Sequence, residues 1–188
     1  MILTNTSICQ MRSLKPLTII SVNLLLLIFY SCSTNSKQEI RKVTDSFYKN
    51  YKGDFRTSEK ALLSIDLIGK IDTAILKEKK EVQKMAASAY PTDKPDMIEG
   101  DVFTSLYDGY TSYKIGDIKL EQNKAIVLVG FIYKEKNPKY KDIQWMDEVV
   151  LVKEHGWKID NVLFKGHSSS ISNLKEVLSN FINSNPAK

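Results

Sequence analysis

A carboxylate stands in the middle of an otherwise apolar segment, IQWMDEVVLVKE (residues 143–154). Side chains alternate between the two faces of a strand, so Trp145, Asp147, Val149 and Leu151 share one face. If that face encloses a cavity, apolar neighbours would raise the pKa of Asp147, as a general base requires. The alternative is a hydrogen-bonded or edge-exposed aspartate with no reactive role. Asp147 is therefore the candidate for catalysis, and both interpretations remain open.

A second pair of carboxylates lies in EGDVFTSLYDG (residues 99–109), where Asp101 and Asp108 stand beside Gly100 and Gly109. Carboxylate and backbone oxygens together can hold a cation. Aspartate next to glycine is also the usual chemistry of a tight turn. We favour turns, and we predict no metal site.

The segment around this motif, residues 90–110, is long for a connection inside a compact domain. It carries Phe103, Leu106, Tyr107 and Tyr110, which make it too apolar for disorder. We expect Phe103 and Leu106 to insert into the core. Alternatively, Tyr107 and Tyr110 line an entrance and contact a partner or ligand. The candidate pocket or entrance residues are thus Trp145, Asp147, Phe103, Tyr107, Tyr110, Asp101 and Asp108.

The remaining reactive residue types do not indicate an enzyme. His155 fits a hairpin turn, and His167 stands alone in a serine-rich connector. The run GHSSS has Ser170 where the G-x-S-x-G nucleophile motif requires glycine. The chain has no glycine-rich phosphate loop and no His-Glu metal motif. We expect no catalytic residue.

The charge pattern argues against nucleic acid as a partner. The chain has 27 basic and 22 acidic residues, and the basic ones are dispersed. The one cluster of basic residues, KEKK at residues 77–80, is typical of a solvated helix face. A nucleic-acid surface needs clustered arginine with interleaved aromatics, and beyond residue 32 the only arginines are Arg41 and Arg56.

Cys32 is the residue with the clearest chemistry. It ends an apolar run, residues 17–30, that follows Arg12 and Lys15. The run is shorter than the ~20 residues of a membrane-spanning helix, and its layout is that of a secretory signal peptide. The Ser-Cys end resembles a bacterial lipoprotein signal, in which the cysteine thiol receives a lipid and becomes the first residue. An uncleaved anchor and a core helix are the alternatives.

A lipidated Cys32 determines the expected location. Diacylglycerol and acyl chains such as palmitate would be the only cofactor-like groups, and two or more chains anchor a protein stably. No acidic residue occurs between Cys32 and Glu39. Surface-exported lipoproteins of some bacteria carry such acids, so we expect this membrane-anchored protein to face the periplasm of the cell envelope.

Apolar periodicity predicts helices first and strands second. Steps of three and four predict one helix that ends at Gly53 and a second that begins near Thr57 or Ser58. Alternation and turn residues predict four strands in an antiparallel meander, at residues 114–122, 125–133, 143–154 and 157–164. Because these strands are apolar on both faces, we expect an amphipathic C-terminal helix, residues 171–182 capped by serines 168–170, to cover the second face.

This order of elements predicts an α+β fold. We assign residues 1–31 to a signal peptide, 32–37 to a lipidated tether, 38–164 to the main domain and 165–188 to a connector with the C-terminal helix. The segments FYKNY, EGDVFTSLYDG and DEVVLVKEHGWKIDNVLF resemble a family of bacterial lipoproteins known as domain of unknown function 3828. That family belongs to the nuclear-transport-factor-2-like (cystatin-like) superfamily.

The resemblance covers residues 38–164. It implies a cone-shaped sheet wrapped around a long helix, with a cavity between them, and it implies no reaction. Some enzymes of the superfamily, such as ketosteroid isomerases, use a cavity carboxylate.

Three function classes follow. The first is a non-catalytic envelope lipoprotein that binds a protein partner or peptide, of which a toxin-neutralising immunity protein is one form. The second is a small-ligand binder with an apolar cavity. The third is an enzyme built on Asp147.

Overall fold

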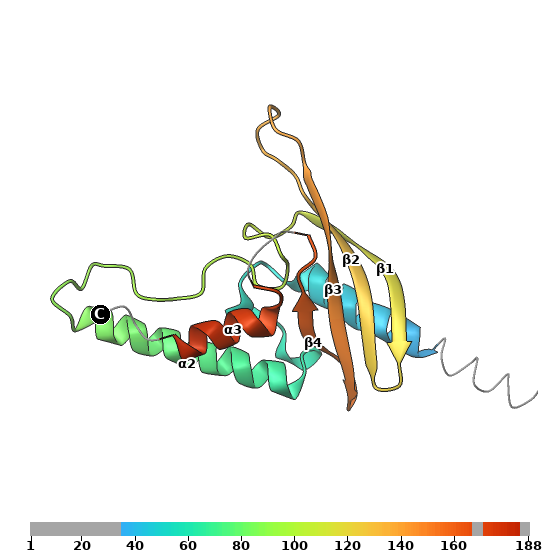
Figure 1. The fold of residues 1–188 in the computed structure, drawn as a ribbon, viewed down its shortest axis with the longest axis horizontal. Coiled ribbons are helices and arrows are strands. Elements are labelled where there is room, and N and C mark those ends of the chain that lie inside the picture. The colour runs from blue at the N-terminus through green and yellow to red at the C-terminus, as the bar shows by residue number, and fades with distance from the viewer. Residues whose placement is uncertain (1–34, 167–170, 185–188) are drawn as a thin grey trace, which may run out of the picture. The chain divides into compact units, whose positions relative to one another are not determined.

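The computed structural model describes residues 35–166 and 171–184 of the chain (Figure 1). The described residues from 37 onward belong to one compact unit. It contains helices and one four-stranded antiparallel sheet, so the predicted α+β fold is confirmed. Cys32, the apolar run before it, His167 and serines 168–170 lie outside the described residues. Among the residues described, no helix is long and apolar enough to cross a bilayer.

The N-terminal helix covers residues 35–50. Ile40, Phe47 and Tyr48 are fully or almost fully buried, which is the one-sided pattern expected of an amphipathic helix. Gly53, with φ of 82°, follows the helix at the predicted place. Residues 35–37, assigned above to the tether, are helical.

Helix α2 (Ile65–Ala86) begins later than predicted. Thr57 and Ser58 lie instead in and beside a short 3₁₀ turn, Phe55–Thr57, which a second turn, Lys60–Leu62, follows. The N-cap is Ser64, whose hydroxyl accepts a hydrogen bond from the Leu67 N–H at 3.1 Å. The buried residues of α2 recur at steps of three and four and are Leu67, Ile71, Ala74 and Glu78.

The sheet is a meander in the order β1-β2-β3-β4. Its strands are β1 (Ser112–Glu121), β2 (Lys124–Tyr133), β3 (Ile143–Glu154) and β4 (Gly156–Leu163). Gln122 (φ 34°) and Gly156 (φ 113°) make the two tight turns where the sequence placed them. The register shifts between Ile115 and Ile118 in β1.

One face of the sheet is buried against the N-terminal helix, which lies across β1 to β3 (Figure 1). The ring of Tyr48 on this helix lies 5.1 Å from that of Phe131 on β2. Alternate residues of β2 and β3 form this face, namely Ala125, Val127, Val129, Phe131, Trp145, Asp147, Val149 and Leu151.

Helix α3 (Leu174–Asn183) packs against α2 and β4. Its buried side chains are Leu174, Leu178 and Phe181. Its N-cap is Asn173, whose side chain accepts from the Glu176 N–H at 3.0 Å. Leu163 also forms an antiparallel bridge to Asn173, and Ile159 forms a parallel bridge to Leu63, so the entries to both helices lie beside β4.

The second face of the sheet is not covered by α3 as predicted. Ile126 and Leu128 on this face are half-buried, and Met146 is 55% exposed. The prediction failed because the apolar stripe of α3 pairs with the long helix α2, a partner that strand periodicity does not reveal.

Candidate functional site

Asp147 lies on the buried face of β3 with no exposed surface. Its Oδ2 accepts hydrogen bonds from Thr104 Oγ1 (3.2 Å), the Ser105 N–H (2.8 Å) and Trp145 Nε1 (3.1 Å). Its Oδ1 accepts from the backbone N–H groups of Lys165 (2.8 Å) and Gly166 (3.2 Å). The carboxylate therefore has five donors in place of apolar surroundings.

With these five donors, Asp147 has a structural role. It ties the loop before β1 and the connector after β4 to the centre of the sheet. Trp145, a predicted pocket residue, is itself buried and also donates to Thr104 Oγ1 at 2.8 Å. Both oxygens of Asp147 are occupied, so neither is directed at an open space where a substrate could lie. The hydrogen-bonded interpretation matches the structure.

The loop before β1 folds into the core as expected. Phe103 has no exposed surface, and its ring lies 4.6 Å from that of Phe47 and 5.0 Å from that of Tyr51. Leu106 is partly buried against the same core. The insertion prediction is therefore confirmed, and Phe103 does not line an entrance.

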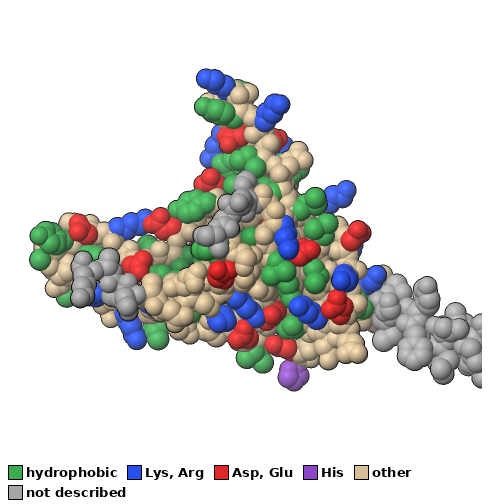
Figure 2. Space-filling view, in the orientation of Figure 1, with side chains coloured by type: hydrophobic (Ala, Val, Ile, Leu, Met, Phe, Trp, Pro, Cys, Tyr) green, Lys and Arg blue, Asp and Glu red, His purple; other side chains and the backbone are tan. Residues whose placement is uncertain are grey.

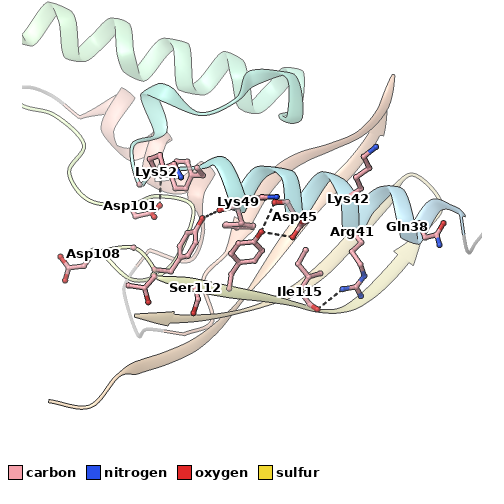
Figure 3. A pocket seen from close by; sticks show the side chains of 17 residues that line it. Gln38, Arg41, Lys42, Asp45, Lys49, Lys52, Asp101, Asp108, Ser112 and Ile115 are labelled. Carbon is pink, nitrogen blue, oxygen red and sulfur yellow. Dashed lines mark hydrogen bonds between the residues drawn. The ribbon is translucent and has the colours of Figure 1, made fainter. Parts of the chain in front are cut away.

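An open groove of about 1200 Å³ runs between the N-terminal helix, the start of β1 and the end of this loop (Figure 3). The helix and the residues just after it contribute polar side chains with Tyr48 and Tyr51, and the loop and strand contribute Tyr110 and Tyr113. The lining residues that carry the argument are Arg41, Lys49, Tyr51, Asp101, Tyr110 and Tyr113.

The groove tyrosines are held by hydrogen bonds of their hydroxyl groups. Tyr110 donates to the Tyr48 carbonyl at 2.6 Å, and Tyr113 donates to Asp45 Oδ1 at 2.9 Å. Tyr51 donates to Asp101 Oδ1 at 3.0 Å. Burial raises the pKa of Tyr51 and of Tyr110 above the ordinary value, so both remain protonated donors. The wall is therefore rigid and aromatic.

The cations of the groove differ in what they contact. Arg41 donates to the carbonyls of Ile115 (3.0 Å) and Gly116 (2.9 Å), at the bulge of β1. Lys49 and Lys52 have no hydrogen-bond or ion-pair partner among the described residues. Lys42 points to the opposite side of the helix from Arg41 (Figure 3). The rim thus offers unpaired positive charge.

Asp101 lies at the floor of the groove. Its Oδ1 accepts from Tyr51 and from the Phe103 N–H (2.8 Å), whereas its Oδ2 is buried and has no partner among the described residues. Burial raises the pKa of Asp101 to about 6, and the nearby charge of Asp147 adds to the rise. Gly109, with φ of 74°, packs against Oδ2: a Cβ there would lie 2.9 Å from it.

Two predicted entrance residues lie at the outer side of the loop. Tyr107 is 59% exposed, packs over Gly100 and donates to Glu99 Oε2 at 3.1 Å. It lines an adjoining pocket of about 510 Å³, which shares Asp101 and Asp108 with the groove. Asp108 is exposed, and no group of three or more metal-ligating side chains occurs within residues 35–166 and 171–184.

The seven predicted residues therefore separate into two places. Phe103, Trp145 and Asp147 belong to the core, while Asp101, Asp108, Tyr107 and Tyr110 lie at the groove and its neighbour. Sequence reasoning missed the helix wall, whose signal was a run of charged residues at helical spacing opposite the apolar stripe. On the face that Figure 2 shows, basic and acidic side chains are interspersed, with no continuous basic stripe.

Comparisons of the chain with protein-family models, with curated proteins and with solved structures find no match.

Proposed function

We propose that this chain is a non-catalytic, membrane-anchored lipoprotein of the bacterial cell envelope, and that it binds a protein partner or peptide in the groove between the N-terminal helix and β1. The observation that carries the proposal is the lining of that groove. It combines Arg41 with four tyrosines, Tyr48, Tyr51, Tyr110 and Tyr113. Tyrosine and arginine are the residue types most enriched at the energetic centres of protein interfaces.

The fixed tyrosine hydroxyls support a binding role further. A partner would meet side chains already held in place, so it would lose little of its affinity to ordering them. The unpaired lysines at the rim, Lys49 and Lys52, would favour approach of an acidic segment, because complementary charge mainly raises association rates and specificity.

The non-catalytic part of the proposal rests on two aspartates, Asp147, which is fully buried, and Asp101, which is part-buried. Asp147 has both oxygens occupied, and the free oxygen of Asp101 faces Gly109 and has no exposed surface. A general base must come within about 3 Å of the proton that it abstracts. Neither carboxylate offers an oxygen to the groove for that purpose.

The anchor part of the proposal rests on the sequence before residue 33. Its short apolar run and terminal Cys32 fit a lipoprotein signal. Metabolic labelling with a palmitate analogue tests this part. Cys32→Ser should abolish the label and move the protein out of the detergent phase, and an unchanged label would contradict the anchor.

Photo-cross-linking in the native envelope tests the groove. A photoreactive amino acid placed at Lys49 should give a defined cross-linked product, because this exposed side chain lines the groove. The same group at Tyr140, which is 60% exposed on the β2–β3 loop, is the matched control. We expect the Tyr113→Ala change to remove the product at Lys49 while the protein stays folded. Equal products from Lys49 and Tyr140 would contradict the groove as the binding surface.

A further inference from the structure

The loop between β2 and β3, residues 134–142, projects from the body of the domain (Figure 1). A turn at Asn137 gives its tip a defined shape. The side-chain oxygen of Asn137 accepts from the Lys139 N–H at 3.0 Å, and its carbonyl accepts from the Tyr140 N–H at 3.0 Å. The chain from residue 136 to residue 142 is exposed throughout. The loop therefore presents its side chains to whatever lies beyond that end of the sheet.

The loop gathers four lysines. They are Lys134, Lys136, Lys139 and Lys141. Each is exposed, and none of their ammonium groups has a hydrogen-bond or ion-pair partner within residues 35–166 and 171–184. With the acids Glu135 and Asp142, the loop has a net charge of +2. No two of these lysines are adjacent in the sequence, but the loop brings them to one projection, where basic and apolar side chains meet at the tip (Figure 2).

Exposed apolar side chains accompany this charge. Tyr140 lies between two of the lysines and is 60% exposed. Met146, on the face of the sheet that α3 leaves uncovered, is 55% exposed near the start of β3. A tyrosine has an apolar ring and a polar hydroxyl group, so it is suited to the boundary between water and hydrocarbon. Lysines beside it extend their charged ends toward headgroups while their stems cover apolar surface.

The shape of the loop favours a flat partner. The side chains that dominate protein interfaces lie in well-packed pockets. Neither the groove nor the adjoining pocket includes a residue of this loop, whose tip is convex. A bilayer surface requires no pocket, because it attracts clustered lysines by the summed charge of its anionic headgroups.

We propose that the β2–β3 loop is a membrane-contact site, which binds the surface of a bilayer that contains anionic phospholipid, with its four lysines among the headgroups and Tyr140 at the interface. One lipid chain alone gives marginal membrane binding, and a basic patch is a recognised second attachment. The loop would thus fix the orientation of the domain on the membrane. A phospholipid contact gives no protein cross-link, so Tyr140 still serves as the control for the groove, and each proposal can fail alone.

Quenching of fluorescence by brominated phospholipids tests the proposal. The full-length chain with Tyr140→Trp is reconstituted into vesicles of brominated phosphatidylcholine with phosphatidylglycerol. Trp145 and Trp157 are 6% and 3% exposed, so the chain without the change supplies the background. The indole at position 140 should be quenched in these vesicles and not in vesicles of brominated phosphatidylcholine alone. Salt at about 1 M, where the Debye length is about 3 Å, should remove the quenching.

Two matched pairs of changes locate the charge that matters. Lys136→Gln with Lys139→Gln should weaken the contact about 25-fold, because each lysine at an anionic surface contributes roughly fivefold. Lys79→Gln with Lys80→Gln removes the same charge from α2 and should change the quenching less than twofold. All four lysines are exposed, so both variants should fold.

Three results would overturn the proposal. The first is an indole at position 140 that is not quenched in the anionic vesicles, as expected if the loop binds an acidic protein or only solvent. The second is equal quenching with and without phosphatidylglycerol, which would show that charge has no part. The third is an equal loss of quenching in the loop variant and the α2 variant, which would show that the loop is not the contact.

Discussion

Two aspartates of this protein, the fully buried Asp147 and the part-buried Asp101, lie in opposite circumstances. Asp147, on a central strand, accepts five hydrogen bonds and leaves neither oxygen free. Asp101, in the loop before β1, accepts two on one oxygen and, among the described residues, none on the other. The difference teaches that burial alone does not mark a reactive carboxylate. Asp147, on the strand, joins segments that are distant in the sequence. Asp101, in the loop, has one paired carboxylate oxygen and one that lacks a partner among the described residues, at the floor of the groove.

The largest expected effect comes from removing the strand carboxylate. Asp147→Ala should lower the free energy of unfolding by roughly 3–5 kcal/mol, since the buried Thr104 and Trp145 donors and three part-buried backbone N–H groups lose their acceptor. Denaturant unfolding measures this loss. Asp108→Ala, on the exposed end of the loop, should change stability by less than about 0.5 kcal/mol. Similar losses of unfolding free energy in Asp147→Ala and Asp108→Ala would contradict the different roles of the strand and loop carboxylates.

Asp101, the loop carboxylate, should instead make the free energy of unfolding depend on pH. Its pKa is about 6 in the folded protein and about 3.9 in an unfolded chain. Protonated Asp101 therefore contributes stability that is fully present below pH 4 and is lost as the pH rises through 6. The loss should be about 2–3 kcal/mol. The measurement is the difference in unfolding free energy between the natural chain and Asp101→Asn at pH 4 and pH 7, and a constant difference would contradict the raised pKa.

The contact between Gly109 and Asp101 sharpens the same comparison. Gly109→Ala should cost about 1–2 kcal/mol, because φ is 74° and the new Cβ would lie 2.9 Å from the unpaired Asp101 oxygen. In an Asp101→Ala background only the backbone part should remain, about 1 kcal/mol. A double-mutant cycle separates the backbone strain from the contact with the Asp101 oxygen. Perfect additivity of the two changes in unfolding free energy would mean that the oxygen moves aside without a loss of stability.

The smallest effects concern the two loop tyrosines. Tyr110→Phe should cost about 1 kcal/mol, because the Tyr110 hydroxyl donates to the Tyr48 carbonyl at 2.6 Å in a half-buried place. Tyr107→Phe removes only a surface hydrogen bond to Glu99 and should stay within about 0.5 kcal/mol. Thermal melting compares the two. A larger loss at Tyr107 would show that the outer side of the loop, and not the groove wall, holds it in place.

The sequence predicted the elements better than it predicted their contacts. Strand alternation placed Asp147 and Trp145 on one shared face, which is the buried face in the structure, and the apolar loop residues predicted the insertion of Phe103. Most partners of Asp147 could not be predicted, because four of its five donors come from residues 104–105 and 165–166, about 40 and 20 positions away. No local pattern encodes such a meeting.

The groove wall could not be predicted from the sequence, for a related reason. Periodicity identifies the buried stripe of the N-terminal helix, and the opposite face then resembles any solvated helix face. Lys49 and Tyr113 form one wall only because β1 lies beside the helix. The same limit explains α3: its apolar stripe was evident, but whether α2 or the sheet would receive it depends on packing across the whole domain.

The two hydrogen bonds from Arg41 to the bulge of β1 have a consequence for how the protein resists aggregation. A sheet with free outer strands can recruit strands from neighbouring molecules and grow into aggregates. Here β4 is bordered by bridges to Leu63 and Asn173, and the carbonyls of Ile115 and Gly116 on the other outer strand are occupied by a guanidinium. These contacts interrupt both outer strands, so a neighbouring molecule finds no continuous run of free backbone groups at the bulge of β1 or along β4 on which a shared sheet could start.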